Sequence, residues 1–199
     1  MNKEENLIYV KKILNSRLKE YMKKDIIVTR DLKEIIEKTK LSDSTILRMF
    51  DTTYQKDFKL ENLIIVITKG FETTPKDFFD KQESFTKNVN NNCNYIELTR
   101  RLLIYHKDNL GISDFIQLAN LINSKFDISE KKIYSSNILD IFEGRKKCTI
   151  NTFLKILKGM NLTINAFFND SEKMEYIMEI ESMSNEEVKK FKSYNQKSH

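Results

Sequence analysis

Apolar positions along the chain recur every three or four residues, over segments that are long enough for helices. In the first half this spacing predicts helices over about 4–24, 31–39, 43–50 and 60–71, with a helical turn at 76–79. In the second half it predicts helices over about 95–107, 114–125, 130–142 and 150–160, then an amphipathic segment over 171–183. Glycine (4) and proline (1) are scarce, so the chain lacks the turn residues that sheets need. The pattern predicts an all-α fold.

Polar residues at the expected helix starts supply candidate caps. A side-chain oxygen at such a position accepts a hydrogen bond from a backbone N–H that the helix leaves unpaired. We expect Ser42, Ser113 and Ser129 to act in this way. Asp31 with Glu34 three residues later has the spacing of a capping box.

The two halves of the chain contain similar segments. Segments 43–50, 69–71 and 78–79 resemble 135–142, 158–160 and 167–168, in that order. The first pair lies 92 residues apart and the other two lie 89 apart, which places Ile64 opposite Phe153. Because only a loop length changes between the pairs, the pattern predicts two copies of one fold.

An asparagine-rich polar run over 87–94 separates the copies and reads as a linker. We therefore predict an N-terminal domain over 1–80, a linker over 81–94, a second domain over 95–170 and a C-terminal helical extension over 171–199. Helical spacing predicts one core that contains Ile46, Leu47, Phe50, Ile64 and Phe71, and another that contains Ile138, Leu139, Phe142, Phe153 and Met160.

The charge of the chain is concentrated in one region. The net charge is +5, with 34 basic and 29 acidic residues. Segment 131–160 alone has seven basic residues and two acidic ones, a surplus as large as that of the whole chain. A local basic surplus suits a polyanionic partner, whereas interspersed charges mostly solvate a surface.

The order of a short helix, a turn, a Ser-capped helix, a loop and an apolar helix that ends in Gly-Phe-Glu-Thr-Thr-Pro-Lys-Asp-Phe-Phe resembles the Xre/Cro family of phage-repressor DNA-binding domains. Residues 13–79 and 98–168 carry the two resemblances. Leu118-Ala119 matches the Leu-Ala pair of the family's first motif helix, and Lys40 stands where the family has a turn glycine. The resemblance implies two lambda-repressor-like helix-turn-helix domains in tandem, each presenting one helix to the DNA major groove.

Such a helix reads base edges with its N-terminal side chains, while nearby loops hold phosphates. The DNA-binding candidates are Asp43, Ser44, Thr45 and Arg48 in the first copy and Lys131, Lys132, Ser135, Ser136, Asn137, Arg145, Lys146 and Lys147 in the second. Asn137 can pair with adenine, and the basic loop 145–147 can hold phosphates. The alternative for both sets is a solvated charged surface on a helix that packs only against its neighbours.

The sequence therefore predicts a sequence-specific, double-stranded DNA-binding transcriptional regulator of the Xre type, acting as a repressor with its two units as a pseudo-dimer. The alternative is a protein-binding adaptor or inhibitor on a degenerate helix-turn-helix scaffold. The C-terminal amphipathic helix either closes the second core or binds a protein partner or a second copy of the chain.

Other chemistry has no support in the sequence. Cys93 and Cys148 have no CxxC partner and read as reduced thiols. His106 has no second ligand at metal spacing and reads as a surface histidine. There is no phosphate loop or nucleophile motif and no apolar run of membrane length. We expect a cytoplasmic protein that is not an enzyme, with no cofactor, no metal and no membrane partner.

Overall fold

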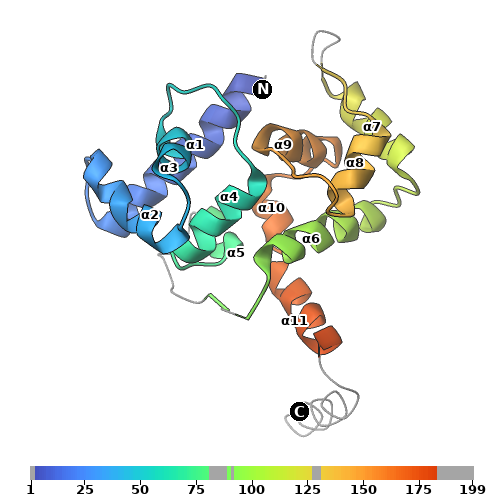
Figure 1. The fold of residues 1–199 in the computed structure, drawn as a ribbon. Coiled ribbons are helices and arrows are strands. Elements are labelled where there is room, and N and C mark those ends of the chain that lie inside the picture. Colours follow the sequence, from blue (N-terminus) through green and yellow to red (C-terminus); the bar gives the residue numbers. More distant parts are fainter. Residues whose placement is uncertain (1–2, 81–88, 91, 127–130, 183–199) are drawn as a thin grey trace, which may run out of the picture.

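The computed structural model describes residues 3–80, 89–90, 92–126 and 131–182. Within these residues every regular element is a helix, and one isolated β-bridge joins Lys59 to Thr149 (Figure 1). The predicted all-α class is confirmed.

Most helices follow the sequence-based boundaries closely, and the helix Ile164–Phe168 is an additional one that the sequence pattern did not predict. The first half contains α1 (Lys3–Met22), the 3₁₀ turn η1 (Thr29–Asp31), α2 (Leu32–Thr39), α3 (Asp43–Phe50), α4 (Leu60–Ile65), the π-helical turn η2 (Val66–Gly70) and α5 (Pro75–Phe79). The second half contains α6 (Tyr95–Asn109), α7 (Phe115–Ser124), α8 (Ser135–Phe142), α9 (Ile150–Gly159), α10 (Ile164–Phe168) and α11 (Ser171–Ser182).

One predicted boundary is wrong. The helix expected from about residue 130 begins only at Ser135, and Tyr134 before it is extended, with φ −92° and ψ 147°. The side chain of Asn123 explains the delay, because its amide nitrogen donates to the Ile133 carbonyl oxygen and its amide oxygen accepts from the Ile133 N–H, each at 2.9 Å. These bonds hold the chain before α8 in an extended path, so Lys131 and Lys132 lie outside the helix.

The predicted helix caps are partly confirmed. The Ser42 hydroxyl accepts from the Thr45 N–H and caps α3. Asp114, not Ser113, caps α7 by accepting from the Gln117 N–H at 2.7 Å. Asp31 does not begin a capping box with Glu34, because its carboxylate instead accepts from the Val28 N–H at 2.9 Å. The predicted cap Ser129 lies outside the described residues.

The helix order α1–α5 recurs as α6–α10, and equivalent residues make equivalent contacts. Arg17 Nε on α1 donates to the Phe78 carbonyl oxygen at 2.8 Å. His106 Nε2 on α6 lies 3.1 Å from the carbonyl oxygen of Phe167, the counterpart of Phe78. His106 is therefore not the surface histidine that the sequence suggested, since it is only 7% exposed.

The π-helical turn η2 changes the sequence alignment of the copies. The Phe71 N–H bonds to the Val66 carbonyl oxygen, five residues back, so this helix holds one residue more than α9. Leu60 and Ile150, which begin the two helices, lie 90 residues apart, whereas residues after the π turn lie 89 apart. Leu63, rather than Ile64, is therefore the counterpart of Phe153.

The interiors of the two copies form one continuous hydrophobic core rather than two separate cores. Most of the predicted core residues are buried. Leu47 is the exception at 38% exposed, and Leu139 is half-buried. On α3 the side chains of Ile46, Met49 and Phe50 fill the inward stripe, so the intervening Leu47 points outward.

The copies meet through equivalent residues. At the bridge between Lys59 and Thr149, the Leu60 N–H donates to the Cys148 carbonyl oxygen and the Ile150 N–H donates to the Phe58 carbonyl oxygen. Residues 58 and 60 are the counterparts of 148 and 150, so each copy gives the other the same bond. Reciprocal contacts of this kind define an isologous, two-fold-like interface.

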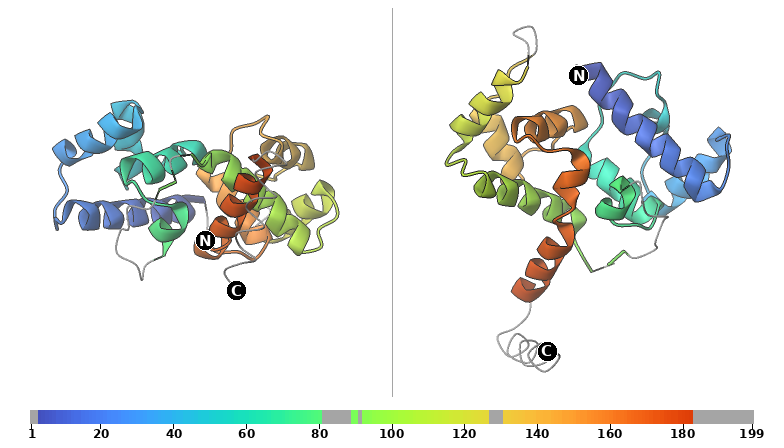
Figure 2. Two further views of the ribbon diagram at one scale, coloured as in Figure 1. Left: turned by 90° about the horizontal axis from the view of Figure 1, so that it is seen from below. Right: turned by 180° about the vertical axis from the view of Figure 1, so that it is seen from behind.

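Helix α11 projects beyond α10 at one end of the molecule (Figure 2). It packs on α6, where Arg101 pairs with Glu181 and Lys173 Nζ donates to the Tyr105 hydroxyl at 3.1 Å. Met174 is 7% exposed and joins the core. The apolar side of the C-terminal segment therefore closes the second half of the chain.

Candidate nucleic-acid interface

The turn between α2 and α3 has a left-handed residue at its centre. Lys40 follows the last residue of α2 with φ 58° and ψ 19°, and its N–H donates to the Ile36 carbonyl oxygen at 3.0 Å. This conformation favours glycine because a Cβ crowds the backbone there. A lysine thus adopts the backbone that a turn glycine normally supplies.

The predicted reading residues of α3 lie at the start of its outer face. Asp43, Ser44 and Arg48 are exposed and Thr45 is half-buried. The Ser42 hydroxyl is 2.9 Å from the Thr45 hydroxyl and 3.2 Å from that of Ser44, so the hydroxyls form one local cluster. The Arg48 guanidinium lies 5.4 Å from the centre of the Tyr54 ring. This face offers hydroxyls, one carboxylate and one cation to a partner.

A buried lysine fixes the other end of α3. Lys11 Nζ on α1 donates to the carbonyl oxygens of Arg48 and Asp51 at 2.7 Å and of Tyr54 at 2.5 Å. Burial lowers the pKa of Lys11, and the carboxylates of Asp51 and Asp57 act in the opposite direction. A cation at the C-terminus of a helix also complements the helix dipole.

Lys11 is not among the site residues predicted from the sequence, although the hydrophobic pattern contains a signal for it. Lys11 stands on the stripe of α1 that is otherwise apolar, four residues after Leu7 and three before Leu14. In the second copy Arg100 does related work, because its guanidinium donates to the Phe142 carbonyl oxygen at 2.7 Å at the end of α8. Each copy therefore clamps the end of its exposed helix from its first helix.

On α8 the predicted base reader is already engaged. The side-chain oxygen of Asn137 accepts a 2.6 Å hydrogen bond from Lys146 Nζ. Ser136 is exposed, and Ser135 is half-buried. Lys146 and Asn137, predicted for phosphate and base contacts respectively, thus form one unit that joins the basic loop to the start of the helix.

Acidic neighbours offset much of the basic surplus around α8. Arg145 pairs with Asp140 at 2.9 Å and also with Glu143. Lys147 pairs with Glu61 of the first copy at 2.9 Å. Lys131 and Lys132 are exposed. The count over 131–160 already includes Asp140 and Glu143, so it is Glu61 from the first copy that makes the local charge lower than that count suggests.

Two further cations in this region stack on an aromatic ring. The Nζ atoms of Lys155 and Lys158 lie 4.6 Å and 4.5 Å from the centre of the Phe126 ring. Lys155 is only 9% exposed. Part of the basic surplus in the sequence therefore packs within the second copy, against the end of α7.

The two sets of predicted DNA-binding residues lie on different parts of the molecule and do not form one patch. The set on α3 belongs to the first half of the fold, and the set on and around α8 belongs to the second, with α4 and α9 between them (Figure 1). If both residue sets bind the same partner, the relative orientation of α3 and α8 must allow it.

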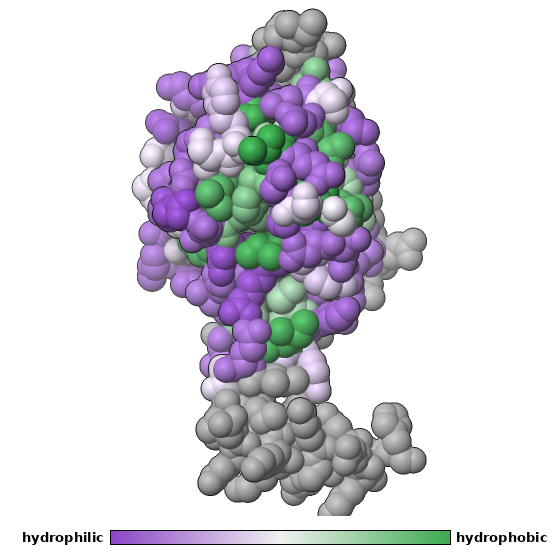
Figure 3. Space-filling model, turned by 90° about the vertical axis from the view of Figure 1, so that its right-hand side faces the viewer, coloured by the Kyte–Doolittle hydropathy of each residue, from purple (hydrophilic) through white to green (hydrophobic). Residues whose placement is uncertain are grey.

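Helix α7 presents apolar side chains on its outer surface. Ile116 is 64% exposed and Leu121 is 36% exposed, and both line a shallow depression on this helix. Tyr134, just before α8, is 63% exposed. Hydrophobic and hydrophilic residues are interspersed on the side of the molecule that contains α7 (Figure 3).

Within the described residues, no group of three or more His, Cys, Asp or Glu side chains is arranged to hold a metal ion. None of the helices described there has the length and apolarity of a membrane span. No protein-family model, curated protein or solved structure matches the chain.

Proposed function

We propose that this chain is a sequence-specific, double-stranded DNA-binding transcriptional regulator, in which two helix-turn-helix units in tandem act as a covalent pseudo-dimer. The reciprocal bridge at Lys59 and Thr149 carries the proposal. DNA half-sites are related by a two-fold axis, so a protein with internal two-fold pairing can address both. Linkage makes the second contact intramolecular.

Local geometry supports the assignment of each unit. In the first copy the left-handed Lys40 and the Ser42 cap set the angle between α2 and α3. The N-terminal face of α3 then lies open to a partner. In the second copy the longer connection between α7 and α8 replaces this turn, and the Asn123 bonds to Ile133 order its end.

The proposed contacts divide into two chemical groups. Lys131, Lys132 and Lys146 are phosphate ligands, since a cation that neutralises a phosphate releases a counterion. Ser136 and the amide of Asn137 on α8, with Ser44 and Arg48 on α3, face base edges. Arg145 and Lys147 contribute less to DNA affinity than their charge suggests, because their ion pairs with acidic residues must break before they can bind phosphate.

A salt titration tests this surface. Affinity for a labelled duplex would be measured by fluorescence anisotropy at several salt concentrations for wild type, Lys132→Ala, Lys146→Ala and the control Lys19→Ala, an exposed lysine on α1. Each phosphate contact that is lost lowers the slope of log affinity against log salt by about 0.9. We expect the first two variants to show this drop on every sequence and the control to match wild type. Equal, salt-independent affinities for all four proteins would contradict the proposal.

A second candidate is a protein-binding adaptor or inhibitor, and the exposed Ile116 on α7 favours it. Its counterpart on α2 is Lys33, which gives a matched control. Under this candidate, a photo-crosslinking residue at position 116 captures one discrete partner in cells and the same residue at position 33 does not. The salt titration then shows no duplex binding.

A further inference from the structure

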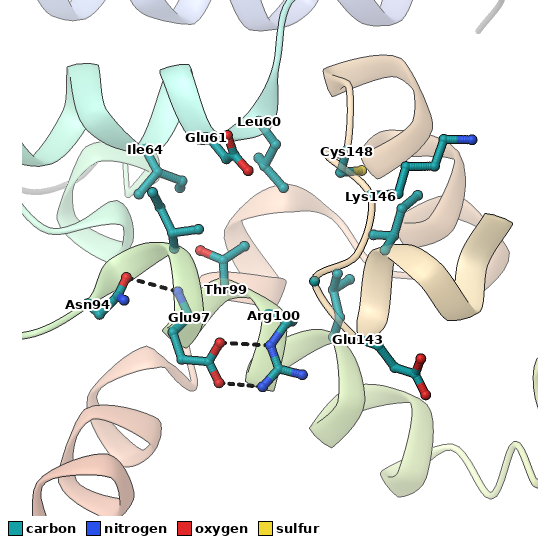
Figure 4. A pocket seen from close by; sticks show the side chains of 14 residues that line it. Leu60, Glu61, Ile64, Asn94, Glu97, Thr99, Arg100, Glu143, Lys146 and Cys148 are labelled. Atoms are coloured by element: carbon teal, nitrogen blue, oxygen red, sulfur yellow. Dashed lines mark hydrogen bonds and ion pairs between the residues drawn. The ribbon is translucent and has the colours of Figure 1, made fainter. Parts of the chain in front are cut away.

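A pocket of about 360 Å³ lies between the two copies, and its walls come from both. Helix α4 supplies Leu60, Glu61 and Ile64, while α6 with the residue before it, the end of α8 and the segment between α8 and α9 supply the remaining walls (Figure 4). The volume lies within the range of about 300–1,000 Å³ that is usual for small-molecule sites.

The pocket exists because the pairing of the copies is not fully symmetric. Helix α1 packs on α9, and its Leu7 is 2% exposed. Helix α6 faces α4 across the pocket, and Ile96, the counterpart of Leu7, is 41% exposed and lines the pocket. An apolar side chain that is covered on one side of the pseudo-dimer is thus left open on the other.

The polar groups of the pocket select a cation. The carboxylate of Glu61 lines the cavity, whereas the charged ends of Glu143 and Lys146 point away (Figure 4). Glu61 Oε2 also pairs with Nζ of the exposed Lys147 at 2.9 Å, and an exposed ion pair of this kind contributes little, so a bound ammonium group can share or replace it. Arg100 is held by both carboxylate oxygens of Glu97 and by the Phe142 carbonyl oxygen, so an anion would have to displace these partners.

The neighbouring thiol experiences the same field. Burial raises the pKa of Cys148, a residue in the pocket wall, to about 12, and the carboxylates of Asp57 and Glu61 add to the effect. Burial disfavours any charge, so only the smaller part of this shift, which the two carboxylates cause, marks a negative potential that favours a bound ammonium group.

We propose that this pocket binds a small amine with a compact apolar body. The ammonium group pairs with Glu61 and donates a second hydrogen bond to the Thr99 hydroxyl oxygen, whose own proton is donated to the Tyr95 carbonyl oxygen. The apolar body lies against Leu60, Ile64 and Ile96. Because the occupant touches both copies, its binding braces their packing. This pocket is separate from the proposed DNA contacts, and Lys146 alone belongs to both sets of residues.

Methyl NMR on protein labelled at isoleucine tests the proposal, with benzylamine as the probe. Ile64, Ile96 and Ile141 line the pocket, while Ile26 and Ile116, at 78% and 64% exposed, serve as internal controls. We expect saturable shifts at the first three and none at the controls. Benzyl alcohol should bind about tenfold more weakly and benzoate more weakly still, because they lack the charge-assisted bond to Glu61.

Two variants and a control complete the experiment. Glu61→Gln should remove the preference for benzylamine over benzyl alcohol, and Ile96→Trp should abolish saturable binding of both by filling the pocket. Glu37→Gln, at an exposed acid of α2, should bind as wild type does. The proposal is overturned if no probe saturates the pocket methyls, if Ile26 and Ile116 shift equally, or if Glu61→Gln leaves the preference unchanged.

Discussion

The rings of Phe79 and Phe168 stack across the junction of the two copies, with centroids 5.4 Å apart and an angle of 6° between their planes. These residues occupy the last position of α5 and of α10, so they are counterparts within the repeat. Both are at most 5% exposed. This contact and the Lys59–Thr149 bridge both join counterpart residues of the two copies.

Truncating either ring should weaken the whole fold, because the two copies share one core. We expect Phe79→Ala and Phe168→Ala each to lower the free energy of unfolding by about 3–5 kcal/mol. The double variant should lose less than the sum of the two, by about 0.5–1.5 kcal/mol, since one partner is absent in each single variant. Urea unfolding followed by circular dichroism measures all three. Strict additivity would show that the rings do not interact.

The left-handed turn residue gives a stabilising prediction. Lys40→Gly should raise the free energy of unfolding by about 1 kcal/mol, because glycine has no Cβ to crowd the backbone at φ 58°. Lys125 also follows a helix, but with φ −91°, so Lys125→Gly should instead destabilise by about 0.5–1 kcal/mol. If both variants are destabilised equally, the turn between α2 and α3 does not have this backbone.

The sequence predicts the helices well because their signals are local. The boundaries of α3 are those expected, since Ser42 caps its start and the apolar stripe ends at Phe50. The predicted start of α8 is wrong because hydrogen bonds between Asn123 and Ile133, ten residues apart, keep the chain extended before the helix. The prediction that Leu47 is buried is wrong, because helical spacing alone does not decide which residues at the edge of an apolar stripe face the core.

The site is harder to foresee, since it depends on contacts between distant segments. A sequence repeat predicts two similar folds but does not say that Phe79 meets Phe168. The net charge counted over 131–160 could not include Glu61, which pairs with Lys147 from the other copy. Lys11 could have been suspected from its place on an apolar stripe, but its three carbonyl partners could not.

Lys11→Met should destabilise the fold and loosen α3. The substitution leaves three carbonyl oxygens without the cation that now donates to them, and a lost charged hydrogen bond costs about 1.5–3 kcal/mol. Amide hydrogen exchange should rise most in α3 and in the segment after it. Lys12→Met, at the exposed neighbour, is the control. Uniform exchange across the chain in Lys11→Met would contradict a role in fixing α3.

Asp31 should make stability depend on acid pH. The hydrogen bond from Lys24 Nζ, followed by that from the Val28 N–H, lowers the pKa of Asp31 below 3.8. A carboxylate whose folded pKa is depressed stabilises above its unfolded pKa and loses this effect as pH falls through the folded value. The excess stability of wild type over Asp31→Asn should be constant above about pH 5 and shrink below about pH 4. Urea midpoints at pH 7, 5, 4 and 3, with Asp25→Asn as the control, test this. A pH-independent difference would refute it.

Selection from random double-stranded DNA at moderate salt tests the central claim most directly. If the two copies act as a pseudo-dimer, the enriched duplexes share a motif with two parts whose centres lie about one helical turn apart, roughly 10 base pairs. The halves should be related but not identical, because α3 and α8 carry different side chains. Asn137→Ala should relax sequence choice in one half alone. A motif with a single part would contradict the pseudo-dimer, and the absence of any enriched sequence would contradict DNA recognition itself.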